Sequence, residues 1–387
     1  MGCLSWKYQV LCLLSFLFHS TPSSLSYSLS SITPCSALLH FNQSLSLHRD
    51  ASARLDTSAY SSVYDRSNID MCGNSYPKTA SWKEDTDCCT WDGVVCDQTT
   101  RHVIGLDLSC SWLRGPIHSN STLFFLPHLK TLNLAGNCFN ESLISSEFGN
   151  FKTLTHLNLS FSCFFGKIPS EISHLSSLLS LDLSLNGRLL IETPVWKRVI
   201  HNLTQLRELL LDDTNMSSIR PNSLMNLSSS STTLSLHNCR LQGKLENNIL
   251  CFPSIKTLDL GSNDNLDLGS LPKCNWSSNS LKFLDLSSII FSRDLLESIS
   301  NLKFLKHLDL SDCNFTGSIP TSFGNLTQIT YLGLSGNKFN GSIPTLLGNL
   351  TNLTFLALSS NSFSGKIQLP LSNFRFFLFF FFGIQMN

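Results

Sequence analysis

Residues 305–320 read LKHLDLSDCNFTGSIP, residues 329–344 read ITYLGLSGNKFNGSIP, and residues 353–368 read LTFLALSSNSFSGKIQ. The three copies start 24 residues apart and share the template L-x-x-L-x-L-x-x-N-x-L/F-x-G-x-I-P. The alternation within L-x-L predicts a short strand with one buried face. One copy cannot bury its own apolar side chains, so neighbouring copies must stack.

The same template extends towards the N-terminus. Eleven copies are recognised, with intervals of 24 to 28 residues, and their first positions are Val103, Leu129, Leu154, Leu178, Leu206, Ser231, Ile255, Leu281, Leu305, Ile329 and Leu353. A fixed period of this length with leucines at fixed offsets predicts a leucine-rich-repeat solenoid, an α/β repeat fold. We expect a right-handed solenoid over residues 103–368, with a parallel sheet on its concave face. Leu308 and Leu332 should point inward and Asp309 should face water.

The ninth template position is expected to carry a buried hydrogen-bond ladder. Asparagine occupies it at Asn137, Asn186, Asn263, Asn337 and Asn361. A weaker polar side chain replaces asparagine at Ser111, Ser162, Thr214, Cys239 and Cys313. Ile289 cannot take part, so the sequence predicts an interrupted ladder and a local shift there.

Composition and the N-terminus indicate the compartment. With 27 basic and 27 acidic side chains, the chain lacks the excess positive charge of a nucleic-acid binder. The apolar run from Val10 to Phe18, followed by small residues, predicts a signal peptide over residues 1–26. The alternative for this run is a buried strand or helix. Fourteen cysteines also suggest an oxidising compartment.

Residues 27–102 are predicted to form an N-terminal cap. An amphipathic helix should run from Cys35 to about Leu47, followed by a polar loop from Arg49 to Lys78. The first repeat of a solenoid exposes an apolar end that needs a cover. Trp82 and Trp91 supply apolar surface for that purpose.

Disulfides are expected to hold this cap together. Cys88 and Cys89 are adjacent, and a bridge between adjacent residues is strained. The predicted bridges are therefore Cys35–Cys88 and Cys89–Cys96, which leaves Cys110 as the candidate partner of Cys72. A zinc site is the alternative for these cysteines, but no histidine lies at finger-like spacing. The sequence leaves the partners of Cys72, Cys110, Cys251 and Cys274 undetermined, and Cys110 is only the nearest candidate for Cys72.

The cap motif W-x5-D-C-C-x-W-x-G-V-x-C-D, from Trp82 to Asp97, followed by 24-residue repeats with G-x-I-P, resembles the extracellular part of plant leucine-rich-repeat receptors. Residues 75–82, 106–115 and 169–175 narrow the resemblance to the Cf class of receptor-like proteins. It covers roughly residues 35–367. The resemblance implies a cell-surface immune receptor with one membrane span and a short tail, which signals through partner kinases because it has none of its own.

The predicted function is recognition of an extracellular peptide or protein ligand, with co-receptor kinases as partners. The predicted place is the plasma membrane, on its extracellular side, for the full-length family. The alternative is a secreted inhibitor of a cell-wall-degrading enzyme, which uses the same cap and repeats. No catalytic motif survives inspection: His48-Arg49-Asp50 matches a kinase tripeptide without the other kinase motifs. We predict no enzyme, no cofactor, no metal and no nucleic-acid partner.

Two rows of outward-facing positions are the candidate ligand contacts. A basic row shares the second template position and comprises Lys130, Arg207, Lys256, Lys282 and Lys306. An acidic row at the fifth position includes Asp259, Asp285 and Asp309. The alternative is that the two rows only form weak ion pairs and hydrate one another. The interval of 28 residues before Leu206 is expected to be an enlarged convex loop, with a ligand-contacting loop as its alternative.

Glycosylation sequons agree with a secreted chain. The predicted glycan sites are Asn42, Asn120, Asn140, Asn202, Asn226, Asn325 and Asn349. Asn202, Asn325 and Asn349 each stand four residues before a repeat start. Asn158 is also a sequon, but it lies inside a predicted strand on the concave face.

The template stops after Ile367, and residues 369–387 form a Phe-rich tail. Its apolar run from Phe376 to Ile384 is about half the length of a membrane-spanning helix, which needs about 20 residues. The expectation is a truncated ectodomain without a full span. A short membrane-dipping anchor is the alternative.

Overall fold

The computed structural model describes residues 32–52, 72–140, 142–245, 247–269, 280–291 and 294–364. The chain divides into two units, Met1–Thr33 and Pro34–Asn387. The expected signal peptide and the Phe-rich tail lie outside the described residues. No helix in the described ranges has both the length and the apolar character needed to cross a bilayer.

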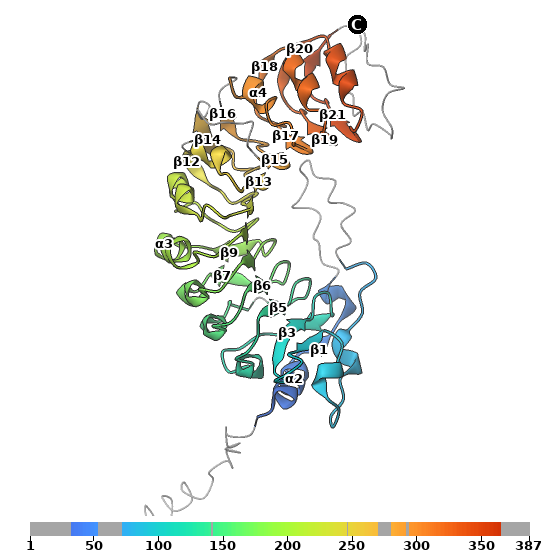
Figure 1. Cartoon of the computed structure of the whole chain (residues 1–387), viewed down its shortest axis with the longest axis vertical. Helices are drawn as coiled ribbons and strands as arrows, with labels where there is room; N and C mark the ends of the chain where they lie inside the picture. Colours follow the sequence, from blue (N-terminus) through green and yellow to red (C-terminus); the bar gives the residue numbers. More distant parts are fainter. Residues whose placement is uncertain are drawn as a thin grey trace, which may run out of the picture. The chain divides into compact units, whose positions relative to one another are not determined.

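A 12-stranded sheet organises the second unit (Figure 1). In spatial order its strands are β2 (Val94–Cys96), β3 (Val103–Asp107), β5 (Thr131–Asn133), β6 (His156–Asn158), β8 (Ser180–Asp182), β10 (Glu208–Leu210), β11 (Thr233–Ser235), β13 (Thr257–Asp259), β15 (Phe283–Asp285), β17 (His307–Asp309), β19 (Tyr331–Gly333) and β21 (Phe355–Ala357). Only β2 is antiparallel to its neighbour; every other pair is parallel and in register. The eleven repeats therefore each contribute one strand, as the period predicts, and the solenoid fold is confirmed.

Small sheets and short helices complete each repeat. The small sheets are β1 (Ser46–Leu47) with β4 (Leu113–Arg114), β7 (Phe165–Lys167) with β9 (Arg188–Leu190), β12 (Gln242–Lys244) with β14 (Asn265–Gly269) and β16 (Ile290–Phe291), and β18 (Thr316–Gly317) with β20 (Lys338–Gly341) and β22 (Ser362–Phe363). The 3-10 helices are η2 (Arg49–Ala51), η5 (Lys78–Ser81), η6 (Cys88–Thr90), η7 (Thr122–Phe125), η8 (Ser146–Asn150), η9 (Ser170–His174), η10 (Pro221–Asn226), η11 (Asn247–Cys251), η13 (Thr321–Asn325) and η14 (Thr345–Asn349). The α-helices are α2 (Pro34–Gln43), α3 (Thr193–Asn202) and α4 (Asp294–Ile299).

The core lies between the main sheet and these outer elements. Leu308 and Leu332 are 0% exposed, which confirms that the template leucines point inward. The segment expected as an enlarged loop before Leu206 instead contains α3. That prediction was wrong because Val195, Trp196 and Val199 recur at helical spacing and are buried.

The asparagine ladder joins successive repeats. Nδ2 of Asn137 donates to the carbonyl oxygens of Leu108 and Leu134 at 2.8 and 2.9 Å, and its Oδ1 accepts from the backbone N–H groups of Ser111 and Leu113. Asn186 and Asn337 repeat this pattern. Each asparagine thus satisfies buried backbone groups of two repeats.

The replacements at the ladder position behave unequally. Cys239 and Cys313 donate weakly through Sγ to Leu211 O and Leu286 O at 3.1 Å. The hydroxyl of Thr214 is buried without a hydrogen-bond partner, so this replacement does not restore the ladder. At Ile289, the expected irregularity is present: the pairing of β14 with β16 shifts register between Asp267 and Gly269.

The cap contains the predicted disulfides. Cys35–Cys88, Cys72–Cys110 and Cys89–Cys96 are all bonded, which excludes the zinc alternative for these cysteines. Trp82 and Trp91 are buried, and their rings stack 5.2 Å apart. The helix α2 ends at Gln43, earlier than expected, because Ser44 N–H caps the carbonyl oxygens of His40 and Phe41 and the chain then enters β1.

Two further features of the cysteines were not predicted. Cys138 and Cys163 join the second and third repeats. Cys239 and Cys313 are buried free thiols within the described residues. Cys251 is disulfide-bonded, while Cys274 lies outside the described residues.

Candidate functional site

The solvent-facing side of the main sheet, called the concave face below, carries three parallel columns of side chains from β13 to β21. The columns come from the second, third and fifth template positions. Because the strands pair in register, equivalent residues of successive repeats lie about 4.8 Å apart. Residues at one template position are therefore aligned from strand to strand, as the repeat period predicts.

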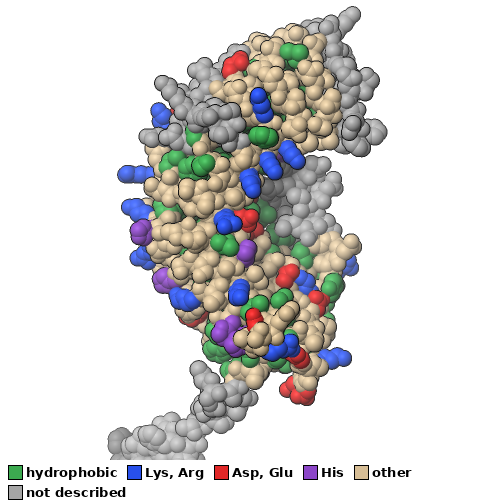
Figure 2. Space-filling model, viewed as in Figure 1, with side chains coloured by type: hydrophobic (Ala, Val, Ile, Leu, Met, Phe, Trp, Pro, Cys, Tyr) green, Lys and Arg blue, Asp and Glu red, His purple; other side chains and the backbone are tan. Residues whose placement is uncertain are grey.

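The basic column is exposed. Lys130, Arg207, Lys256, Lys282 and Lys306 are all exposed to solvent. The backbone carbonyl oxygens of Lys256 and Lys282 accept hydrogen bonds from the next strand, which holds the main chain and leaves the side chains outside. Figure 2 shows basic side chains following one another over β13, β15 and β17. Lys256, Lys282 and Lys306 form no ion pair with another described residue.

An aromatic column occupies the third template position. Neighbouring rings of Phe283, His307, Tyr331 and Phe355 are separated by 4.1, 4.0 and 4.6 Å between centroids, with interplanar angles of 11°, 12° and 3°. All four side chains are half-buried. Burial lowers the pKa of His307 to about 4, so its ring is neutral at neutral pH. The column therefore presents a continuous, mostly uncharged row of ring edges.

The aromatic column was missed at the sequence level, although its signal was present. The third template position holds aromatic rings or histidine in the last four consecutive repeats. Aligning only the leucines conceals this run.

The acidic column is not exposed, which corrects the prediction for three residues. Asp285 and Asp309 are 0% exposed and Asp259 is 3% exposed. Each carboxylate turns back to accept the backbone N–H two residues later, from Gly261, Ser287 and Ser311 at 3.0, 2.8 and 2.9 Å. The aspartates therefore cap the strand ends, and Asp309 does not face water.

Burial also changes how these aspartates titrate. Burial and the charge of Asp285 raise the pKa of Asp309 to about 7, and burial together with Asp285 raises the pKa of Asp259 to about 6. Tyr331 donates its hydroxyl to Oδ2 of Asp309 at 3.0 Å. The acidic column thus supports the aromatic column from below and offers few contacts to a ligand.

The predicted glycan sites differ in their surroundings. Asn120, Asn140, Asn226, Asn325 and Asn349 are exposed. Asn42 and Asn202 are half-buried, and Nδ2 of Asn202 donates to Ser173 O at 3.3 Å. Oδ1 of Asn158 accepts from Ser160 N–H and Ser160 Oγ–H on the concave face. Glycosylation at the seven predicted sites stays a prediction.

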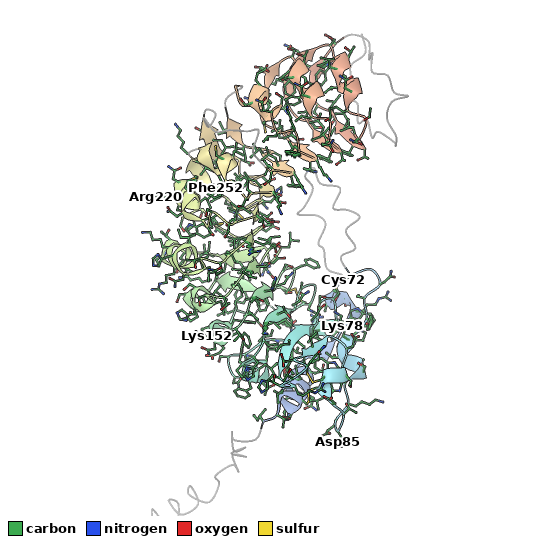
Figure 3. All side chains as sticks on the ribbon, in the orientation of Figure 1. Cys72, Lys78, Asp85, Lys152, Arg220 and Phe252 are labelled. Atoms are coloured by element: carbon green, nitrogen blue, oxygen red, sulfur yellow. A yellow bond between two sulfur atoms is a disulfide. The ribbon has the colours of Figure 1, made fainter. Side chains whose placement is uncertain are left out.

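Basic side chains also lie elsewhere. Figure 3 places Lys152 and Arg220 on the side of the molecule away from the main sheet. Cys72 and Lys78 line a cavity of about 400 Å³ at the junction of cap and first repeat. Nζ of Lys78 is 3.2 Å from Oδ1 of Asp107, so an ion pair and the Cys72–Cys110 disulfide lie beside this cavity.

Comparison with family models agrees with this organisation. A model described as leucine rich repeat N-terminal domain matches residues 67–97. One described as leucine rich repeat matches residues 128–151 and 153–175, and one described as leucine-rich repeat region matches residues 230–373.

The chain is also similar to individual plant proteins. Receptor-like protein 6 of Arabidopsis thaliana is 42% identical over 237 residues, which are 60% of this chain and 24% of the relative. Receptor-like protein Cf-9 of Solanum pimpinellifolium is 40% identical over 241 residues, 62% of this chain and 27% of the relative. The chain thus spans about a quarter of the length of these relatives.

Two solved structures share the fold. The crystal structure of PEPR1-AtPEP1 has a TM-score of 0.55 and 29% identity, covering 74% of this chain and 43% of the other. A plant ice-binding protein has a TM-score of 0.56 and 26% identity, covering 78% of this chain and 94% of the other. By its repeats, its cap and its sequence, the chain is similar to the plant leucine-rich-repeat receptor-like proteins, Cf-9 among them.

Proposed function

We propose that this chain is an extracellular recognition segment of a plant receptor-like protein and that it binds an extended peptide along the concave face of β13 to β21. The observation that carries the proposal is the uninterrupted column Phe283, His307, Tyr331 and Phe355 beside the exposed lysines Lys256, Lys282 and Lys306. Stacked rings supply apolar area, and unpaired lysines supply hydrogen-bond donors for a peptide's carbonyl or carboxylate oxygens.

Similarity to receptor-like proteins over about 60% of the chain supports a receptor role over the inhibitor alternative. Recognition rather than catalysis is the activity assigned to the chain. Signalling through partner kinases at the plasma membrane is part of the proposal and rests on the resemblance to the Cf class of receptor-like proteins. The similarity of the fold to that of PEPR1-AtPEP1 also supports a role in recognition.

The test selects linear peptides from a random 12-residue display library against the full chain secreted by plant cells. Peptides that bind by the proposed surface should lose at least about tenfold in affinity on Tyr331→Ala or Lys282→Ala, as expected for anchor residues that contribute more than about 1.4 kcal/mol. Arg220→Ala is the control, since Arg220 is exposed on the opposite side. Selected peptides that are insensitive to both changes, or a library that yields no binder, would contradict the proposal.

A further inference from the structure

A cluster on the concave face lies outside the aromatic and basic columns. It consists of His237, just after β11, and of Asp259 and Asp285, the last residues of β13 and β15. Nδ1 of His237 is 3.2 Å from Oδ1 of Asp259 and 3.9 Å from Oδ2 of Asp285. One ligand atom from each residue lies within 4.8 Å of the other two. Three consecutive repeats thus bring a nitrogen and two carboxylates to one point.

Gly261 makes the convergence possible. A Cβ at this position would lie 2.6 Å from Oδ1 of Asp285 and 2.7 Å from Oγ of Ser287. Any side chain there would occupy the space that the carboxylate and the hydroxyl now share. Backbone N–H groups of Gly261 and Ser287 hold the two carboxylates in orientation by hydrogen bonds to their Oδ1 atoms.

The charges of the cluster are buried. His237, Asp259 and Asp285 are 9%, 3% and 0% exposed. A third buried carboxylate, Asp212, accepts hydrogen bonds from Ser235 Oγ–H and from the backbone N–H of His237 at 2.6 and 3.0 Å. Three acidic groups therefore surround one imidazole. Buried carboxylates are costly unless hydrogen bonds or an opposite charge compensate them.

We propose that His237, Asp259 and Asp285 bind one divalent metal ion that accepts mixed nitrogen and oxygen ligands, Zn²⁺ being the best match. Imidazole nitrogen and carboxylate oxygen bind Zn²⁺ at about 2.0–2.2 Å, and a tetrahedral ion would keep its fourth position for water or a ligand group. Spacing within 4.8 Å allows all three groups to reach one such ion after small side-chain rotations. The ion would link β11, β13 and β15 and is independent of the peptide site proposed above.

A second cluster of possible metal ligands, which contains two cysteines, does not compete with this one for the metal ion. Cys35, Asp87 and Cys88 also lie close together, but the two cysteines are joined in a disulfide. Their sulfur atoms are thus unavailable as thiolate ligands.

The test uses the full chain, stripped of metal by a chelator, with Zn²⁺, Mn²⁺ and Ca²⁺ each titrated by calorimetry. The expected result is one Zn²⁺ per chain, bound more tightly than Mn²⁺ and much more tightly than Ca²⁺. His237→Gln and Asp285→Asn should each lower Zn²⁺ affinity by more than the roughly 10–100-fold that loss of an outer-sphere partner costs. The control is His156→Gln, which removes an exposed histidine on β6 of the same sheet and should leave the affinity unchanged.

X-ray absorption at the zinc edge of the loaded wild-type chain provides a readout that does not depend on the variants folding. One imidazole nitrogen with oxygen ligands supports the proposal. Sulfur ligands, the absence of stoichiometric Zn²⁺ binding, or equal affinity in His237→Gln and wild type would overturn it.

Discussion

Asp309 shows how a single carboxylate leaves the surface of a sheet that faces solvent. Its Oδ1 accepts from Ser311 N–H and its Oδ2 accepts from the Tyr331 hydroxyl. Gly333 on the next strand provides space for this carboxylate, since a Cβ at position 333 would lie 2.6 Å from Oδ1 of Asp309. The residue therefore gains hydrogen bonds while losing hydration, and its charged form is penalised.

The first prediction concerns the pH dependence of this residue. The pKa of Asp309 is about 7 in the folded chain, against about 3.9 for an unperturbed aspartate. The folded state holds the proton more tightly, so the free energy of unfolding should fall as pH rises from about 4 to 7. Asp309→Asn should remove that fall, melting above wild type at pH 8 and together with it near pH 4. Each 1 kcal/mol corresponds to about 2–4 °C in a chain of this size class.

The measurement is a circular-dichroism melt in metal-free buffer at both pH values. Asp107→Asn is the matched control at the same template position. Burial of Asp107 is outweighed by hydrogen bonds from Ser109 and by the charge of Lys78, which lower its pKa. This variant should show no gain at pH 8. An Asp309→Asn melting point below wild type at pH 8 would refute the assignment.

At the scale of elements, successive 3-10 helices pack through glycine. A Cβ on Gly149 in η8 would lie 2.4 Å from the backbone oxygen of Glu171 in η9. Gly324 in η13 would meet Leu346 O of η14 at 2.9 Å in the same way. The F-G-N motif before a repeat start thus specifies close packing of successive 3-10 helices. Only glycine lets the backbone of the next 3-10 helix approach so closely.

The second prediction follows from this packing. Gly149→Ala should destabilise the chain by about 1–3 kcal/mol, the usual cost of overpacking, since backbone cannot move aside as a flexible side chain can. Chemical denaturation followed by circular dichroism measures the change. Ser146→Ala, on the exposed side of the same helix, should be neutral. Equal stability of both variants would show that η9 shifts at little cost.

At the scale of the molecule, each repeat contacts only its neighbours. Disulfides add covalent links to some of these contacts. Cys138–Cys163 closes a loop of 25 residues between the second and third repeats. In the cap, Cys72–Cys110 ties the cap to the first repeat. The N-terminal part is thereby covalently braced.

The third prediction tests this bracing. Replacing Cys138 and Cys163 together by serine should cost about 3 kcal/mol, as loop-closure entropy suggests for a loop of this length. Hydrogen exchange should show the loss mainly in β5 and β6. Cys313→Ser, which removes a free buried thiol, is the control and should leave β5 and β6 unchanged.

Peptide mapping without reduction should also recover Cys35–Cys88 and Cys89–Cys96. Alkylation of Cys88 in the folded chain would contradict the pairing.

The amino-acid sequence by itself determines the solenoid, the inward leucines such as Leu308, and the cap bridges. These features follow from a period, from apolar alternation and from cysteine spacing, all of which are local in the chain. The burial of Asp309, the Cys138–Cys163 bond and the convergence of His237 with Asp285 appear only in the tertiary structure. They depend on which side chains of successive repeats meet across strands, and that depends on register, on the glycines that leave room, and on desolvation by neighbours that lie 22 or more residues away.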